Sequence, residues 1–201
     1  MQMKFIVKEL STRDIQLKRI IDSSPLCSIG SIPSVISNFE ALVQSIISQQ
    51  LAVSAAASIF QRVKDLAQGY VTVANLSSIS EIEMRKAGVS GAKFKTINGL
   101  TGSVINKEID IENLHKMSED QQIFESLTKL WGIGPWTVDM FLIFQLGRLD
   151  IWPVSDLGVK RGWEKMHLLK NGIEPEILKK KGEKFRPYRS VVAWYCWRTL
   201  D

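Results

Sequence analysis

The chain has 201 residues, 45% of them hydrophobic and 23% charged, with a formal net charge of +5. These are ordinary values for one large or two small globular domains, and they exclude a disordered, collagenous or coiled-coil chain. The longest apolar stretch, Met140 to Leu146, is interrupted by Gln145 and falls far short of the ~20 residues of a membrane span, while the charged N-terminal residues are unlike a signal peptide.

The first 36 residues give the weakest pattern. The spacing of Phe5, Val7 and Leu10 is compatible with a short extended strand, and residues 13–21 are compatible with a helix. We treat residues 1–37 as an N-terminal segment that packs on the C-terminal helices. No strand pattern elsewhere is strong enough to indicate a sheet.

Helical periodicity begins at residue 37. Ser37 and Glu40 form a capping-box pattern in front of a stripe of apolar residues: Phe39, Leu42, Val43, Ile46 and Ile47. A second stripe runs from Ala55 to Leu66 and is ended by Gly69. The pattern leaves open whether residues 48–53 interrupt one helix or join two.

Further helices follow to the end of the chain. We expect them at residues 78–87 (with Gly88 as the C-terminal cap), 92–104, 119–130, 136–146, 157–168, 175–185 and from 187 or 188 to 199. Residues 136–146 are apolar on nearly every face, which predicts a buried helix. The fold class is therefore all-α.

Charge and tryptophan are concentrated near the C-terminus. Residues 1–147 hold 14 basic and 14 acidic side chains, whereas residues 148–201 hold 12 basic and 7 acidic ones, and all six tryptophans follow residue 130. A basic, aromatic-rich region is typical of an anionic partner, nucleic acid first. A solvated charged face is the alternative.

Two cysteines, Cys27 and Cys196, cannot by themselves form a four-ligand zinc or iron–sulfur site. We expect two buried free thiols in a reducing compartment, with a disulfide as the alternative. His115 and His167 stand alone in the sequence, so we expect them to be exposed or locally bonded, and no side-chain metal site is indicated.

The most informative stretch is residues 130–137. Gly132 and Gly134 allow a tight reversal between two helices, and Pro135 suits the first position of the second helix. Backbone amides at such a turn can hold a DNA phosphate without reading sequence. A helix–helix turn without a ligand is the alternative that the residues alone leave open.

This stretch resembles the hairpin of the helix-hairpin-helix (HhH-GPD) base-excision DNA glycosylases. Residues 146–159 resemble the segment that carries the catalytic aspartate of that superfamily. Residues 46–51, 88–93 and 186–197 are similar to its 3-methyladenine DNA glycosylase II branch. The resemblance implies a two-lobed helical fold with an active-site cleft between the lobes, a glycosylase region at 38–199 and the hairpin at 121–146.

The resemblance also implies site residues. Asp156 matches the catalytic position, although the residues alone favour a helix N-cap there, and the two readings are compatible. Trp136, Trp197 and Met140 match the base pocket, where relatives place an aromatic at the position of Met140; core packing is the alternative for the tryptophans. Gln50 or Leu51 matches the wedge that fills the gap left by a flipped base.

The hairpin matches imply further contacts. The DNA-binding positions are Gly132, Ile133, Gly134, Trp136 and Thr137, together with Gln50 and Leu51. The main-chain carbonyls of Thr128, Leu130 and Ile133 match a monovalent-cation site, and no other cofactor is implied. Lys160, Arg161, Lys165 and Arg189 are candidate phosphate contacts, or structural or solvated charges.

The chemistry expected is hydrolysis of an N-glycosidic bond after base flipping. Lyase relatives carry a lysine at the position of Trp136, so the resemblance implies a monofunctional enzyme acting on alkylated or deaminated purines, such as 3-methyladenine and 7-methylguanine. It implies damaged duplex DNA as partner, no membrane or nucleotide cofactor, a monomer, and a cytoplasmic (nucleoid-associated) or nuclear location. A catalytically silent helix-hairpin-helix module that only binds DNA is the alternative.

Overall fold

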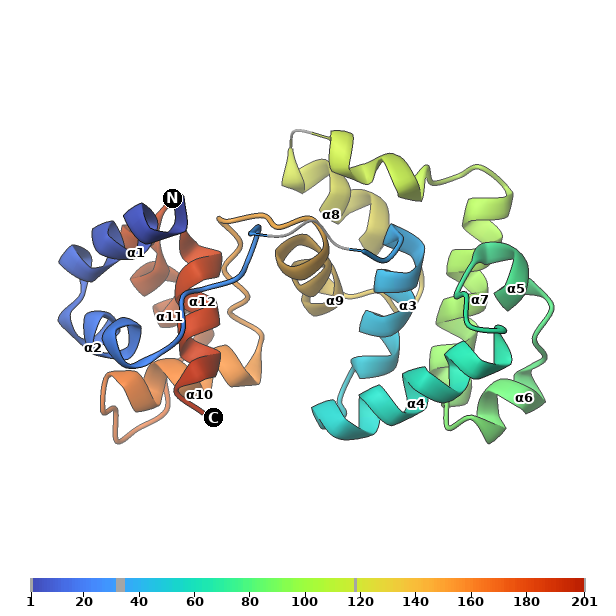
Figure 1. Cartoon of the computed structure of the whole chain (residues 1–201), viewed down its shortest axis with the longest axis horizontal. Helices are drawn as coiled ribbons and strands as arrows, with labels where there is room; N and C mark the ends of the chain where they lie inside the picture. Colours follow the sequence, from blue (N-terminus) through green and yellow to red (C-terminus); the bar gives the residue numbers. More distant parts are fainter. Residues whose placement is uncertain (1, 32–34, 118, 201) are drawn as a thin grey trace. The chain divides into compact units, whose positions relative to one another are not determined.

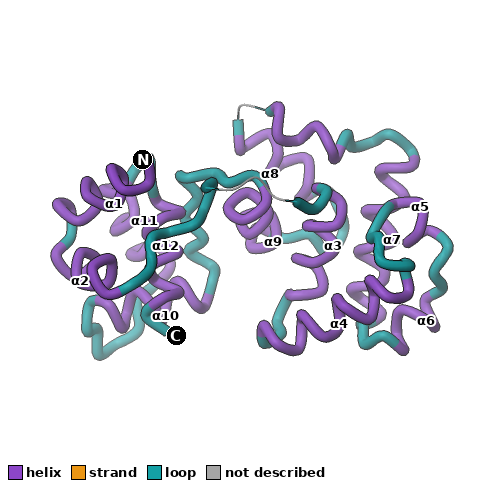
Figure 2. The backbone as a smooth tube through the Cα atoms, viewed as in Figure 1, coloured by secondary structure: helices purple, strands orange, loops and turns teal. Residues whose placement is uncertain are grey.

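The computed structural model describes residues 2–31, 35–117 and 119–200, and within these ranges every regular element is a helix. Figure 2 shows helices and loops but no strand along the described backbone. The elements are α1 (Gln2–Arg13), α2 (Ile15–Ser23), α3 (Asn38–Ser48), α4 (Val53–Leu66), α5 (Val73–Ser77), α6 (Glu81–Lys86), α7 (Gly91–Ile105), the 3₁₀ helix η1 (Ile111–Lys116), α8 (Asp120–Thr128), α9 (Pro135–Met140), the π-helical turn η2 (Phe141–Gln145), α10 (Leu157–Met166), α11 (Pro175–Gly182), the 3₁₀ helix η3 (Glu183–Phe185) and α12 (Arg189–Arg198). The all-α prediction is confirmed.

The chain divides into two compact units. The first unit combines residues 1–33 with residues 142–201, and the second is residues 34–141. The region 38–199 that the family resemblance treats as one stretch is therefore divided within the helix that begins at Pro135. Each unit is described separately below.

The expected strand at the N-terminus is wrong. Residues 2–13 form helix α1, which buries Ile6, Val7 and Leu10 while Phe5 is 65% exposed. The buried positions 6, 7 and 10 follow a helical period of three to four residues, whereas Phe5 and Val7 would share a face only in a strand. The helical period therefore outweighs the short alternation.

The first unit packs its N-terminal helices against its C-terminal ones. In Figure 1, α1 and α2 (blue) lie beside α10 and α12 (orange and red), and α2 contacts both. Asp14 caps α2 by accepting the amides of Gln16 and Leu17, and its carboxylate also accepts from Lys184 and His167. His167 also bonds locally to the carbonyl of Trp163, as expected, and Asp14 is an additional partner from far away in the sequence.

Two glycines of α10 bring α12 close. A Cβ atom at Gly162 would collide with the backbone carbonyl of Cys196, and one at Gly158 would lie 2.7 Å from Cδ1 of Trp197. Because neither glycine has a side chain, the backbone of α12 lies against Gly162 and the indole of Trp197 lies against Gly158. Cys27 and Cys196 in this unit are buried free thiols, as expected.

The second unit is built around α3. Phe39, Leu42 and Ile46 are almost wholly buried, and α3 contacts α4, α7, η1 and α9. Ser37 caps α3 by accepting the amide of Glu40, but the expected capping box is only half formed. The Glu40 carboxylate lies 3.5 Å from Lys64 instead, and Glu112 accepts the amides of Asn38 and Phe39.

The remaining helices agree with the predicted periodicity within a few residues at their ends. The prediction missed the short helices α5 and η1. The helix expected at 136–146 begins at Pro135 and changes to π geometry after Met140. Its expected burial holds for most positions but not for Phe144, which is 55% exposed. Ser118, expected just before the helix at 119–130, lies outside the described residues.

Candidate active site

The hairpin between α8 and α9 depends on its glycines for different reasons. Gly132 adopts φ +81°, and a Cβ atom there would collide with the side chain of Thr96. Both the left-handed backbone and the close contact require glycine. Gly134 is the N-cap of α9 with φ −96°, and a Cβ atom there would meet no heavy atom within 4 Å. Gly134 therefore leaves open space at the start of α9, directly before Pro135.

The turn between α3 and α4 is tied to this hairpin. Gln49 Nε2 donates to the carbonyl of Gly132 at 3.0 Å and to Oγ1 of Thr137 at 2.9 Å. Gln50, the next residue, adopts a left-handed φ of +55°, so residues 49–52 separate two helices, which settles the question that periodicity left open. Both wedge candidates, Gln50 and Leu51, are exposed on this turn. The burial of Leu51 in a core is thereby ruled out, and the choice between the two residues stays open.

The other predicted DNA-binding and cation-binding residues of the hairpin are placed as follows. Thr137 and Ile133 are buried, at 1% and 3% exposure. The Thr137 hydroxyl accepts a hydrogen bond from Gln49, so its partner lies within the protein. Trp136 is half-buried. The carbonyl of Leu130 accepts the amide of Ile133, and Thr128 is the last residue of α8. Carbonyl oxygens are the kind of ligand that hard cations prefer. A cation bound by the carbonyls of Thr128, Leu130 and Ile133 stays a prediction.

A cation and an aromatic ring lie beside the hairpin glycines. Trp131, directly before Gly132, is 56% exposed, and the Lys95 ammonium lies 4.3 Å from the centre of its ring. This cation–π contact holds a positive charge at the hairpin. The sequence drew attention to the glycines but not to this pair, because Lys95 comes from α7, 36 positions earlier.

In the first unit, Asp156 caps α10. Its Oδ1 accepts the amide of Val159 at 2.7 Å and the indole Nε1–H of Trp197 at 2.8 Å. The side chain is 9% exposed. A helix N-cap and the catalytic position were compatible interpretations of Asp156, and the structure shows the N-cap. Both donors hold the carboxylate in place at the start of α10.

Trp197 joins Asp156 to a second aromatic side chain. The rings of Trp197 and Phe144 lie 5.4 Å apart between centroids and are tilted by 34°. Trp197 is half-buried, whereas more than half of Phe144 is exposed. The sequence placed Trp197 in the base pocket but missed both its hydrogen bond to Asp156 and the position of Phe144, which lies in the π-helical turn η2.

Met140 and Trp136, the other pocket candidates, belong to α9 in the second unit. Met140 is 9% exposed, so it is largely covered by its surroundings. The structure brings Asp156 together with Trp197, and the Gln49 turn together with Gly132 and Thr137. A cleft between the lobes that would join these two groups stays a prediction.

Part of the C-terminal basic charge is paired inside the first unit. Arg189 and Arg186 bond to Asp150 and Glu183, and Lys184 bonds to Asp14. Arg189, a candidate phosphate contact, is thus a structural residue here. Lys160, Arg161 and Lys165 lie on α10, and the last two are exposed.

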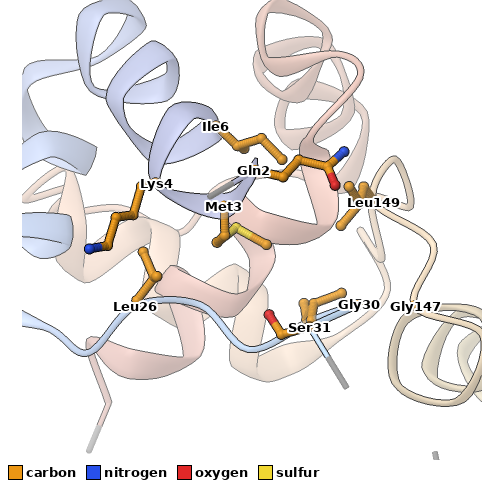
Figure 3. A pocket seen from close by; sticks show the side chains of 10 residues that line it. Gln2, Met3, Lys4, Ile6, Leu26, Gly30, Ser31, Gly147 and Leu149 are labelled. Atoms are coloured by element: carbon orange, nitrogen blue, oxygen red, sulfur yellow. The ribbon is translucent and has the colours of Figure 1, made fainter. Parts of the chain in front are cut away.

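One cavity of about 380 Å³ opens elsewhere in the first unit. Figure 3 shows its lining from α1, from residues 26–31 and from Leu149. Asp156 and Trp197 are not among the lining residues, so this cavity is separate from the candidate site. It lies where Gly30 and Gly147 approach each other, both with positive φ.

No cluster of three or more His, Cys, Asp or Glu side chains in the described part of the chain could hold a metal ion. Among the same residues, no helix has the length and apolar character needed to cross a membrane.

Comparison with known proteins identifies the family. The DNA-3-methyladenine glycosylase 1 of Schizosaccharomyces pombe is 31% identical over 163 residues, covering 80% of this chain and 72% of its own. A solved structure of the S. pombe enzyme in complex with abasic DNA has a TM-score of 0.86 at 28% identity, covering 99% of this chain and 96% of its own. A DNA-3-methyladenine glycosidase from Bacillus halodurans has a TM-score of 0.80 at 32% identity, covering 96% and 88%.

The family model of the HhH-GPD superfamily base excision DNA repair proteins matches residues 43–187. This range includes the Gln49 turn, the hairpin and Asp156, and of the quoted motifs only residues 186–197 extend beyond it. The family predicted from those motifs is confirmed: the chain belongs to the HhH-GPD superfamily of base excision DNA repair proteins.

Proposed function

We propose that this protein is a monofunctional DNA glycosylase of base excision repair, which turns a damaged purine out of the duplex and hydrolyses its N-glycosidic bond. The observation that carries the proposal is the Asp156 carboxylate, held by Val159 and Trp197 at the start of α10. Membership of the family and the names of the relatives support the same activity. In a module that only binds DNA, this carboxylate would serve only as the cap of α10.

The carboxylate suits the charge that the reaction develops. When the bond from C1′ to the base nitrogen breaks, its electron pair leaves with the base and positive charge builds on the sugar. An ionised Asp156 stabilises that charge. A water oxygen then bonds to C1′, and the proton it loses passes to the carboxylate or to solvent. The products are the free base and an abasic site.

The substrates proposed are alkylated purines of the 3-methyladenine and 7-methylguanine type. The relatives named above act on 3-methyladenine, as their names state. Such bases carry positive charge and leave readily, so the enzyme needs an electron-rich surface more than a general acid. Trp197 and the exposed Phe144 supply aromatic faces next to Asp156 in the first unit.

Two further features support hydrolysis without lyase chemistry and binding along the DNA backbone. Trp136 occupies the position where the lyases of the family carry a lysine, so no amine is available there to form a Schiff base. The open space at Gly134 and the charge of Lys95 favour a phosphate at the hairpin. We propose that the protein acts as a monomer.

The test is release of free base from methylated duplex DNA by the wild type and by Asp156→Asn. Asparagine caps helices as well as aspartate, so the variant should fold and bind DNA. We expect base release to fall by about a thousandfold, the scale of losing a preorganised electrostatic group. Wild-type binding without release would instead identify the silent module, and undiminished release by the variant would remove Asp156 from the mechanism.

A further inference from the structure

Lys93 makes an unusual pair of contacts at the end of α3. Its ammonium donates to the carbonyls of Ile47 and Gln49, each at 2.8 Å. The last carbonyls of a helix have no partner within the helix, and a cation suits the negative end of its dipole. Lys93 itself comes from the first turn of α7, more than 40 residues away in the sequence.

The carbonyls that Lys93 holds lie directly before a strained residue. Gln50 adopts φ +55°, a conformation that costs a non-glycine residue about 1–2 kcal/mol. The amides of Gln49 and Leu51 close the turn onto Ile46 and Ser48. A left-handed glutamine persists only where its surroundings fix it, and the two bonds from Lys93 are part of that fixation.

The same helix also supports the hairpin. Thr96, one turn after Lys93, packs against Gly132, while Gln49 bonds across to Gly132 and Thr137. The first two turns of α7 therefore touch both the wedge turn (residues 49–52) and the hairpin. Burial lowers the pKa of Lys93, which is the cost of placing an amine among carbonyls instead of in water.

We propose that Lys93 is a positioning residue, which holds the wedge turn at a fixed place relative to the hairpin so that Gln50 or Leu51 enters the base stack as the damaged nucleotide leaves it. This inference rests on the proposed function. It assigns Lys93 no contact with the substrate: the residue acts through the backbone of Ile47 and Gln49. Its loss should slow the extrusion of a paired base and spare the bond cleavage that follows.

The test compares two duplexes with the same 7-methylguanine, one with cytosine opposite the lesion and one with an abasic analogue opposite it. The second duplex lacks the partner base, so its extrusion depends less on a wedge. For Lys93→Met we expect single-turnover release to fall at least about tenfold on the paired lesion, the scale of losing a charged hydrogen bond, and less than about threefold on the unpaired one. Lys93→Arg should recover most of the loss.

Two further variants keep the test decisive. Lys86→Met removes an exposed lysine of the same unit and should change neither rate. If Lys93→Met does not fold, Gln49→Met removes the bonds to the hairpin and should show the same selective loss. Equal losses on both duplexes, or a Lys93→Arg protein as slow as Lys93→Met, would overturn the positioning role.

A readout without catalysis separates this proposal from the proposed function. A duplex carrying an abasic analogue, with 2-aminopurine opposite it, should brighten when wild-type protein binds, because the wedge unstacks the probe. Lys93→Met should bind with less brightening. Brightening without base release by the wild type would sink the proposed function and leave the wedge role standing; equal brightening by both proteins would sink the wedge role alone.

Discussion

The hairpin of the second unit and the aspartate of the first unit use different means of placing functional groups. At the hairpin, the main chain carries the geometry: a left-handed glycine, an open N-cap and an uncharged clamp from Gln49. Around Asp156, side chains carry it, through an indole N–H and a helix cap. A surface that holds DNA of any sequence is served by backbone contacts, whereas stabilising a cationic sugar requires a charge in one place. Changes at the hairpin should therefore alter stability and binding, and changes around Asp156 should alter rate.

The largest effect should come from the two hairpin glycines taken as a pair. Gly132→Ala adds a methyl group that meets Thr96 in a left-handed backbone, so we expect a loss of about 2–3 kcal/mol in the free energy of unfolding. Gly134→Ala meets no neighbour and should leave the free energy of unfolding within about 0.5 kcal/mol. Thermal and urea unfolding of both variants measure this difference.

For DNA affinity, we expect a clear effect from Gly134→Ala, the variant whose free energy of unfolding should be nearly unchanged. Gly134→Ala is folded but fills the space where a phosphate is proposed, so its affinity for abasic DNA should fall about tenfold, or 1.4 kcal/mol. Fluorescence anisotropy at one fixed salt concentration measures the affinity. A Gly134→Ala protein that binds as the wild type does would show that DNA does not approach this side of the hairpin.

Trp197→Phe tests the second region of the comparison, the surroundings of Asp156. The variant keeps an aromatic ring beside Phe144 but removes the hydrogen bond to Asp156. We expect the single-turnover rate to fall about tenfold to a hundredfold, the effect of one lost hydrogen bond to a charged group, with DNA affinity unchanged. Loss of affinity without loss of rate would mean that Trp197 serves as a binding surface and not as a partner of Asp156.

The smallest effect concerns Asp14, the other aspartate cap of the first unit. Burial alone would raise the pKa of its carboxyl group, but hydrogen bonds from Lys184, the Leu17 amide and His167 outweigh burial and hold the pKa well below its ordinary value. A lowered carboxyl pKa stabilises the fold above the pKa of the unfolded chain, about 3.9, and that stabilisation is lost as the pH falls.

Asp14→Ala should therefore lower the free energy of unfolding at pH 7 by about 1–2 kcal/mol, the scale of a lost N-cap. The deficit should shrink steadily below about pH 4, where the wild-type carboxylate begins to lose its advantage. Urea unfolding at several pH values measures this. A deficit that stays constant down to pH 2 would show that the side chain acts by packing and not by charge.

Periodicity and caps predicted most of the fold because they are local properties. The apolar stripe that follows Ser37 predicts one helix, and the glycine after residue 87 predicts where another helix ends. Both signals come from neighbouring residues alone. The N-terminal strand was wrong because the spacing of Phe5, Val7 and Leu10 was interpreted without Ile6, whose burial in α1 gives the stripe a helical period. The half-formed capping box also involves distant residues: Glu40 lies beside Lys64, and Glu112 accepts the amides of Asn38 and Phe39.

The candidate site was predictable only as far as its motifs reach. Gly132 and Asp156 stand in distinctive local sequences, so a family resemblance could locate them. Lys93 also lies in a recognisable motif, but its role depends on hydrogen bonds to carbonyls at the end of a helix more than 40 residues away in the sequence. Phe144 is exposed within a π-helical turn, which the hydrophobic pattern does not signal.

The glycines of α10 have a consequence for engineering. Replacing a helical glycine by alanine is a common route to greater thermostability. At Gly162 it would push α12 outward, because the added methyl group has no room beside the carbonyl of Cys196. Since Trp197 is the next residue on that helix, the displacement would carry its indole away from Asp156. A routine stabilising substitution six residues from the carboxylate would then look, in an assay, like damage to the chemistry itself.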